Sequence, residues 1–112
     1  MTVVTQPEPS PMTRREKLQE MLTSTPDDPF LHYGLAMECR NAGERDAALA
    51  ELRTVLRLDA RYVAAYFHQG QILAEGGDVA AARDILRSGI AAADRAGDGH
   101  AAEEMRGLLA TL

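Results

Sequence analysis

The 112-residue sequence contains no tryptophan, and aromatic residues make up only 4% of it, although 46% of its residues are hydrophobic. Most of its apolar residues are alanine and leucine. β-Sandwiches draw mainly on valine, isoleucine, threonine and aromatic side chains, whereas closely packed helices accept alanine and leucine readily. The composition therefore favours an all-α fold, and the length suits a single domain with one modest core.

Several other classes of protein are excluded by what is missing. A single cysteine, Cys39, cannot form an internal disulfide, which fits a reducing compartment. No apolar run approaches the roughly 20 residues that a membrane-spanning helix needs. The formal net charge is −5, and because acids and bases are interspersed there is no concentrated basic face for nucleic acid. We therefore expect a soluble, cytoplasmic protein that binds neither nucleic acid nor membrane.

The sequence also lacks a catalytic or metal-binding constellation. Its three histidines, His32, His68 and His100, are not accompanied by other ligands at metal-site spacing. Cys39 with a distant histidine could form a nucleophile pair, but a buried, inert thiol is the simpler interpretation. We accordingly expect no enzyme activity, no metal and no cofactor.

Residues 1–11, MTVVTQPEPSP, hold three of the five prolines. Repeated X-Pro pairs favour extended backbone over helix, so residues 1–12 are predicted to be a disordered, proline-rich tail. Met12 directly precedes a segment with helical patterning, which makes it an alternative translation start.

Amphipathic patterning after the tail predicts six helices joined by short loops. Asp28 can cap a helix that starts at Pro29, and Gly43 can end that helix in the left-handed conformation. Short loops place consecutive helices side by side and antiparallel. The predicted helices cover residues 13–24, 29–41, 45–58, 62–75, 79–95 and 99–111.

Residues 29–96 read as two units of 34 residues in tandem. Four positions recur with that spacing, namely Gly43 and Gly77, Ala48 and Ala82, Leu52 and Leu86, and Arg53 and Arg87. A fixed period of this length with helical patterning is typical of a solenoid of stacked helix pairs. The rival interpretation is an irregular helical bundle whose periodicity arises by chance.

The two units resemble the tetratricopeptide repeat (TPR) family, whose pattern places small and bulky residues at set positions of a helix pair. Ala60 and Asp94 stand where the family usually has proline. Small residues at Ala36, Ala48, Gly70 and Ala82 would let neighbouring helices approach closely. The matching positions are His32, Leu35, Ala36, Cys39, Ala48 and Leu52 in the first unit, and Tyr66, Gln69, Gly70, Leu73, Ala82 and Leu86 in the second.

The resemblance implies a domain organisation for residues 13–112. Residues 29–62 and 63–96 form the two repeats. The segment 13–28 matches the second half of a repeat and is expected to be a leading half repeat. The segment 97–112 departs from the repeat register, although His100 falls on the bulky position of Tyr66, and it is expected to be a capping helix.

The resemblance also implies a binding site, because the first helix of each TPR pair lines a concave groove that binds an extended peptide or a helix. Chaperone-tail binders of the family hold a terminal carboxylate with lysine and asparagine, where this chain has Tyr33, Met37 and His68. Tyr33 and Phe67 either line the groove or pack between helices. The expected groove residues are Tyr33, Met37, Arg40, Asn41, Phe67, His68, Gln71 and Glu75, with Met105, Leu108 or Leu109 added by the last helix.

The sequence thus predicts a non-catalytic protein–protein interaction scaffold whose partner is a peptide or helix of another protein. An alternative is a self-assembling structural protein. In that case a homodimer would form through the groove or through the apolar end of the last helix, which carries Leu108, Leu109 and Leu112.

Overall fold

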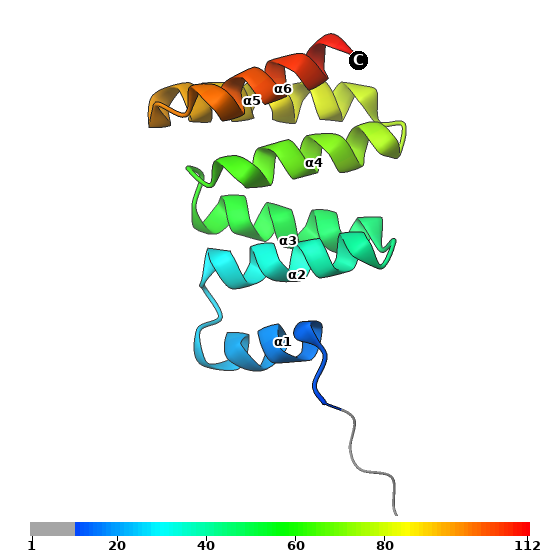
Figure 1. Cartoon of the computed structure of the whole chain (residues 1–112), viewed down its shortest axis with the longest axis vertical. Coiled ribbons are helices and arrows are strands. Elements are labelled where there is room, and N and C mark those ends of the chain that lie inside the picture. Colours follow the sequence, from blue (N-terminus) through cyan, green and yellow to red (C-terminus); the bar gives the residue numbers. More distant parts are fainter. Residues whose placement is uncertain (1–10) are drawn as a thin grey trace, which may run out of the picture.

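The computed structural model describes residues 11–112, which form six helices and, within that range, no strand (Figure 1). Most of the predicted tail, residues 1–12, lies outside the described residues. The expectation of an all-α fold with six helices is confirmed. The helices are α1 (Arg14–Ser24), α2 (Pro29–Asn41), α3 (Arg45–Leu58), α4 (Val63–Glu75), α5 (Val79–Ala96) and α6 (Gly99–Ala110).

Four of the six helices begin at polar caps that satisfy free backbone N–H groups of the first turn. Thr13 and Glu16 form a reciprocal capping box at α1. The carboxylate of Asp28 accepts a hydrogen bond at the start of α2, and Asp78 and Asp98 do the same for α5 and α6. These starts depend on local sequence, which explains why they could be predicted.

Three helices are followed by a glycine in the left-handed region of backbone space. Gly43, Gly77 and Gly97 have φ values of 77°, 86° and 70°. Residues with a Cβ rarely adopt this conformation, so glycine is strongly favoured there. The recurrence of glycine after 34 residues therefore reflects the same turn at the end of α2 and α4.

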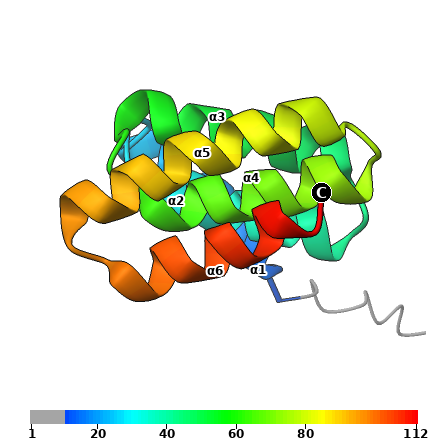
Figure 2. The same cartoon turned by 90° about the horizontal axis from the view of Figure 1, so that it is seen from above.

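Consecutive helices run antiparallel and stack along the long axis of the molecule (Figure 1). The most extensive contacts join α2 to α3, α4 to α5 and α5 to α6, while α3 packs on α4, and α1 on α2, through smaller interfaces. Viewed from above, α3 and α5 lie on one side and α2, α4 and α6 on the other (Figure 2). The molecule therefore has one face formed by the first helix of each pair together with α6.

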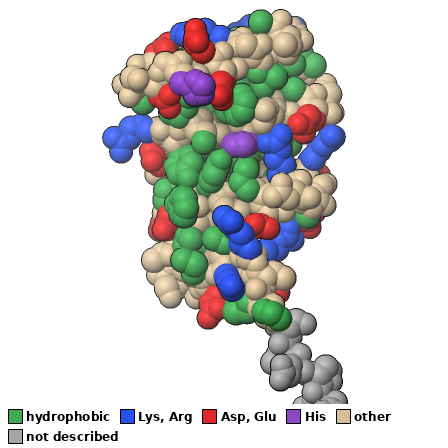
Figure 3. Space-filling model, viewed as in Figure 1, with side chains coloured by type: hydrophobic (Ala, Val, Ile, Leu, Met, Phe, Trp, Pro, Cys, Tyr) green, Lys and Arg blue, Asp and Glu red, His purple; other side chains and the backbone are tan. Residues whose placement is uncertain are grey.

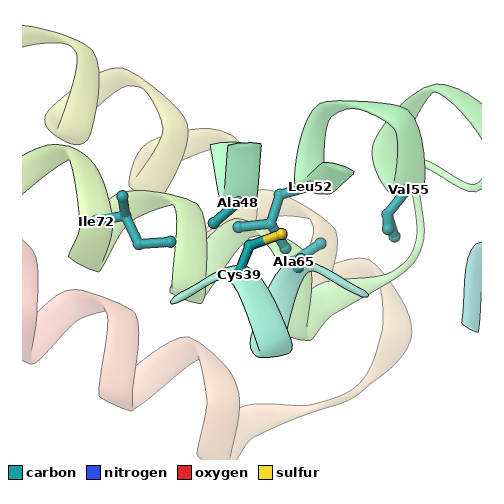
Figure 4. Packing of buried hydrophobic residues seen from close by; sticks show 7 residues of the cluster. Cys39, Ala48, Leu52, Val55, Ala65 and Ile72 are labelled. Carbon is teal, nitrogen blue, oxygen red and sulfur yellow. The ribbon is translucent and has the colours of Figure 1, made fainter. Parts of the chain in front are cut away.

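The core is divided into buried clusters between neighbouring helices rather than gathered at one centre. Figure 4 shows the cluster between α2, α3 and α4, where the Cys39 side chain lies among aliphatic groups. Burial raises the pKa of the Cys39 thiol, against the lowering effect of Arg15, so the thiol is protonated and inert at neutral pH. The cluster comprises Ala36, Cys39, Ala48, Leu52, Val55, Ala65 and Ile72.

Small residues allow the close approach of helices, as expected. Ala36, Ala48 and Ala82 are fully buried, with 0% exposure. A Cβ placed on Gly70 would lie only 2.5 Å from Leu86 Cδ2. Bulk at these positions would push the helices apart.

One detail of the predicted packing is wrong. The spacing of Leu18, Met21 and Leu22 predicts that all three lie on the apolar side of α1, but Met21 is 54% exposed, because among the helices only α2 packs extensively against α1. Asp94 occupies the position at which the family usually has the proline that follows the second helix, yet α5 continues through it to Ala96. Among the helices of residues 11–112, none is both long and apolar enough to cross a membrane.

Candidate functional site

The predicted groove residues come from α2 and α4, and they lie where these two helices face each other. Figure 3 looks onto the side of the molecule formed by α2, α4 and α6, here called the front face, where hydrophobic side chains gather over α2 and α4. Helical periodicity places Tyr33, Met37 and Arg40 on the same side of α2, and His68, Gln71 and Glu75 on the same side of α4.

Arg40 links α2 to α4 through three hydrogen bonds. Its Nη1 donates to His68 Nδ1 at 2.8 Å and to Gln71 Oε1 at 2.9 Å, and its Nη2 donates to Glu75 Oε1 at 3.1 Å. Only 24% of the Arg40 side chain is exposed. The guanidinium thus serves as an internal connector, and three of its five N–H donors have acceptors on α4.

His68 is held in one neutral form by this arrangement. An arginine can only donate, so His68 Nδ1 must accept, and the proton then lies on Nε2. Burial lowers the pKa of His68 below 6.5, and the positive charge of Arg40 lowers it further. His68 is therefore uncharged at neutral pH and presents a polar aromatic ring.

Aromatic rings form a continuous set beside the Arg40 network. The ring centroids of Tyr33 and Tyr62 are 5.1 Å apart, those of Tyr33 and His68 are 5.6 Å apart, and those of Phe67 and His68 are 5.8 Å apart. The tilted and edge-on orientations are those that aromatic pairs prefer. Burial raises the pKa of both tyrosines, so their hydroxyls stay protonated.

A hollow of about 260 Å³ opens between α4 and α6, next to this aromatic set. Its walls are largely apolar, with two carboxylates at the start and middle of α6. Asp98 uses one carboxylate oxygen to accept from the Ala101 N–H at 3.1 Å. The lining residues are Val63, Ala64, Phe67, His68, Asp98, Ala101 and Glu104.

Tyr33 and Phe67, which were expected either in the groove or in the core, are both half-buried. Their inner sides pack against the buried clusters, and Phe67 also lines the hollow. Met37 is half-buried beside the same cluster as Tyr33, whereas Asn41 is exposed at the end of α2. The structure therefore brings together seven of the eight predicted residues and leaves Asn41 at the margin.

The contribution expected from the last helix needs correction. Met105 was one of three residues of the last helix, with Leu108 and Leu109, that could line the groove, but it is 0% exposed and its sulfur packs against Gly89 of α5. Leu108 and Leu109 are half-buried against the same cluster. His100 was expected at a packing position, but its side chain is 86% exposed. Its Nε2 lies 2.7 Å from Glu104 Oε1. In place of Met105, α6 contributes Ala101 and Glu104 to the hollow. The buried residues of α6 are Ala102 and Met105, which do not lie 34 residues after the buried Tyr66 and Gln69 of α4.

Several residues of the front face were not predicted. Tyr62 lies 29 positions after Tyr33, at the start of α4, so no periodicity along one helix could predict that the two rings meet. Their contact arises because α2 lies next to the start of α4. Phe30 is 65% exposed near the start of α2. The position of Phe30 directly after the Asp28-Pro29 helix start could have indicated this exposure, because few neighbouring elements pack against the first turn of a helix.

Among the described residues, no group of three or more His, Cys, Asp or Glu side chains comes together that could hold a metal ion. The nearest approach is His32, whose Nδ1 lies 2.7 Å from Glu51 Oε2 and whose Nε2 lies 2.7 Å from the Pro26 carbonyl oxygen. Both ring nitrogens are engaged by protein acceptors, which makes His32 a structural connector between α2, α3 and the preceding turn.

Known proteins of similar sequence and fold place these features in a family. No protein-family model matches the chain. A TPR repeat-containing protein of Pseudomonas aeruginosa is 32% identical over 97 residues, which cover 87% of this chain and 92% of that protein. A protein of Bordetella parapertussis with a known solution structure is 33% identical, with a TM-score of 0.79 over 90% of this chain and 88% of that one.

Two further solved structures share the fold. A tetratricopeptide repeat domain protein of Salinibacter ruber is 28% identical, with a TM-score of 0.72 over 77% of this chain and 87% of that chain. The TPR2B domain of yeast Sti1 is 19% identical and matches the fold alone, with a TM-score of 0.80 over 85% of this chain and 76% of that chain. The six stacked helices, the 34-residue recurrence and the curated relative agree: the chain belongs to the tetratricopeptide repeat family.

Proposed function

We propose that the protein is a non-catalytic interaction module that binds a peptide or helix of a partner protein on its front face. The observation that carries the proposal is the row of half-exposed apolar and aromatic side chains, Tyr33, Met37 and Phe67, which runs toward the hollow between α4 and α6. Half-buried aromatic groups are typical anchors of protein interfaces, because they offer a large apolar area at little cost in conformational entropy.

The rigidity of this face supports the proposal. The Arg40 hydrogen bonds and the tilted contact between the Tyr33 and His68 rings link α2 to α4, so little order has to be gained on binding. Within the same fold, the TPR2B domain of yeast Sti1 takes part in a complex with pHsp70, which shows that stacked helix pairs can carry protein binding.

A random-peptide display library selected on the protein tests the proposal. We expect selected peptides to share an apolar anchor and to lose about tenfold or more in affinity for the Tyr33→Ala, Met37→Ala double variant, since interface anchors contribute about 1–2 kcal/mol or more each. Met21→Ala is the matched control, because Met21 is an exposed apolar residue on α1. Equal binding by the double variant would argue against this face.

The self-assembling alternative rests on the apolar end of α6. Leu108, Leu109 and Leu112 are each half-buried against the neighbouring cluster. The exposed residues of α6 are polar or small, namely Gly99, His100, Glu103, Glu104, Arg106, Gly107 and Ala110. That distribution suits a solvent-facing cap better than an end-to-end interface. Sedimentation of a stable dimer at micromolar concentration would instead favour self-assembly.

A further inference from the structure

We propose that the hollow between α4 and α6 receives a cationic side chain, an arginine or lysine, of the bound partner segment. This inference rests on the proposed function and specifies its partner. The hollow is defined by Phe67 and Val63 on α4, Ala101 on α6, and the carboxylates of Asp98 and Glu104. None of its lining residues is a lysine or an arginine.

The walls and the rim of the hollow match the two parts of a long basic side chain. Arginine and lysine lay an aliphatic stem along apolar surface while the charged head reaches a polar partner. Phe67 and Ala101 offer the apolar surface, and the ring of Phe67 can also attract a cation to its face. Asp98 and Glu104 then supply negative charge at the end of the stem. Figure 3 shows acidic side chains on this part of the front face, over α6.

The neighbouring groups offset this negative charge only in part. The backbone N–H of Ala101 is already bonded to Asp98, so this donor in the first turn of α6 is not free for an anion. His68, the ring on the α4 side, is neutral because burial and Arg40 lower its pKa. Glu104 Oε1 lies 2.7 Å from His100 Nε2, but the Glu104 side chain is 48% exposed and remains accessible to a partner side chain.

An acidic partner fits this face less well. The guanidinium of Arg40 already donates to His68, Gln71 and Glu75, and the Glu75 carboxylate at 3.1 Å from Nη2 would repel a partner carboxylate. The chain as a whole also carries a net charge of −5, which slows the approach of acidic segments and favours basic ones. The occupant we infer is therefore a segment with an apolar residue over Tyr33 and Met37 and a basic residue in the hollow.

The test starts from the peptides selected by the display library, prepared with blocked termini. We expect arginine or lysine at one fixed position relative to the apolar anchor. Replacing it by glutamine should weaken binding by about tenfold, as should the Asp98→Asn, Glu104→Gln double variant, and the two changes combined should weaken binding little further. Asparagine retains the capping function of Asp98. Glu103→Gln is the control for each single change, Asp98→Asn or Glu104→Gln, since it removes one negative charge from α6 outside the hollow.

The possible results separate the inference from the proposed function. Selected peptides without a basic preference, or a double variant that binds them as well as the unaltered protein, would overturn the cationic occupant and leave the proposed binding face standing. Failure to select any peptide would count against the proposed function itself. A dimer that dissociates when Asp98 and Glu104 are neutralised would assign the hollow to a second copy of the chain, and would overturn a separate basic partner.

Discussion

The hydroxyl of Tyr66 donates a 2.7 Å hydrogen bond to the carbonyl oxygen of Ala60, which ties α4 to the turn before it. The residues 34 positions earlier make the same connection: His32 Nε2 lies 2.7 Å from the carbonyl oxygen of Pro26. Two different side chains thus perform one task at equivalent positions, which explains why identity between the two units is low although their geometry is similar. At His100 the pattern stops, because that ring lies beside Glu104 of its own helix.

Removing the Tyr66 hydroxyl should weaken the attachment of α4 to the turn that joins it to α3. We expect Tyr66→Phe to lower the free energy of unfolding by about 0.5–1.5 kcal/mol, the usual net contribution of one hydrogen bond. The ring itself stays buried in both proteins, so the change isolates the hydroxyl. Urea denaturation measures the difference, and an unchanged midpoint would mean that water replaces the bond at no cost.

Gly89 offers a sharp test of helix packing. A Cβ at this position would lie 2.5 Å from Met105 Sδ and 2.5 Å from Tyr66 Cβ, so Gly89→Ala should destabilise the protein by about 1–3 kcal/mol through overpacking. Gly107→Ala is the opposite control: it is helical, has nothing within 4 Å of the added Cβ, and should stabilise by about 0.5–1 kcal/mol. Thermal unfolding of both variants decides whether α5 and α6 pack as described.

The environment of His32 predicts that its contribution to stability is greatest in acid. Burial opposes protonation, but hydrogen bonds with the Pro26 carbonyl and the Glu51 carboxylate raise the pKa of His32 above 6.5. A group with a raised folded pKa stabilises fully below the unfolded value and loses that contribution as pH rises through the folded value. The stability difference between the unaltered protein and His32→Gln should therefore shrink between pH 6 and pH 8, as measured by denaturation at each pH. A difference that grows with pH would contradict this prediction.

His68 should behave in the opposite way. Its lowered pKa means that its neutral form is favoured in the folded state, so its contribution is present above pH 6.5 and is lost as pH falls through the folded pKa. We expect the ring to titrate below 6.5 in an NMR experiment, and Arg40→Gln to move the pKa of His68 upward because a nearby positive charge is removed. A pKa unaffected by Arg40→Gln would show that burial alone sets the value.

The pairing of side chains across helices was the part of the candidate site that sequence could not supply. Spacing along a helix placed Met37 and Arg40 on one side of α2, but it gave no sign that Arg40 would be held by Glu75, 35 residues away. The packing of α6 was visible only in part: the sequence showed that residues 97–112 depart from the repeat register, but not that Met105 would be fully buried and His100 exposed. Such outcomes depend on the angle at which one helix packs on another.

The sequence by itself determined the six helices, their ends and the family. Caps such as Thr13 and Asp28 and the left-handed Gly43 and Gly77 act within a few residues, and a 34-residue recurrence is visible without coordinates. The tertiary structure alone decided which groups stay free on the front face. The hydrogen bonds of Arg40 to α4 and the hollow beside Phe67 exist only in the folded protein, because both depend on how closely and at what angle α2, α4 and α6 pack.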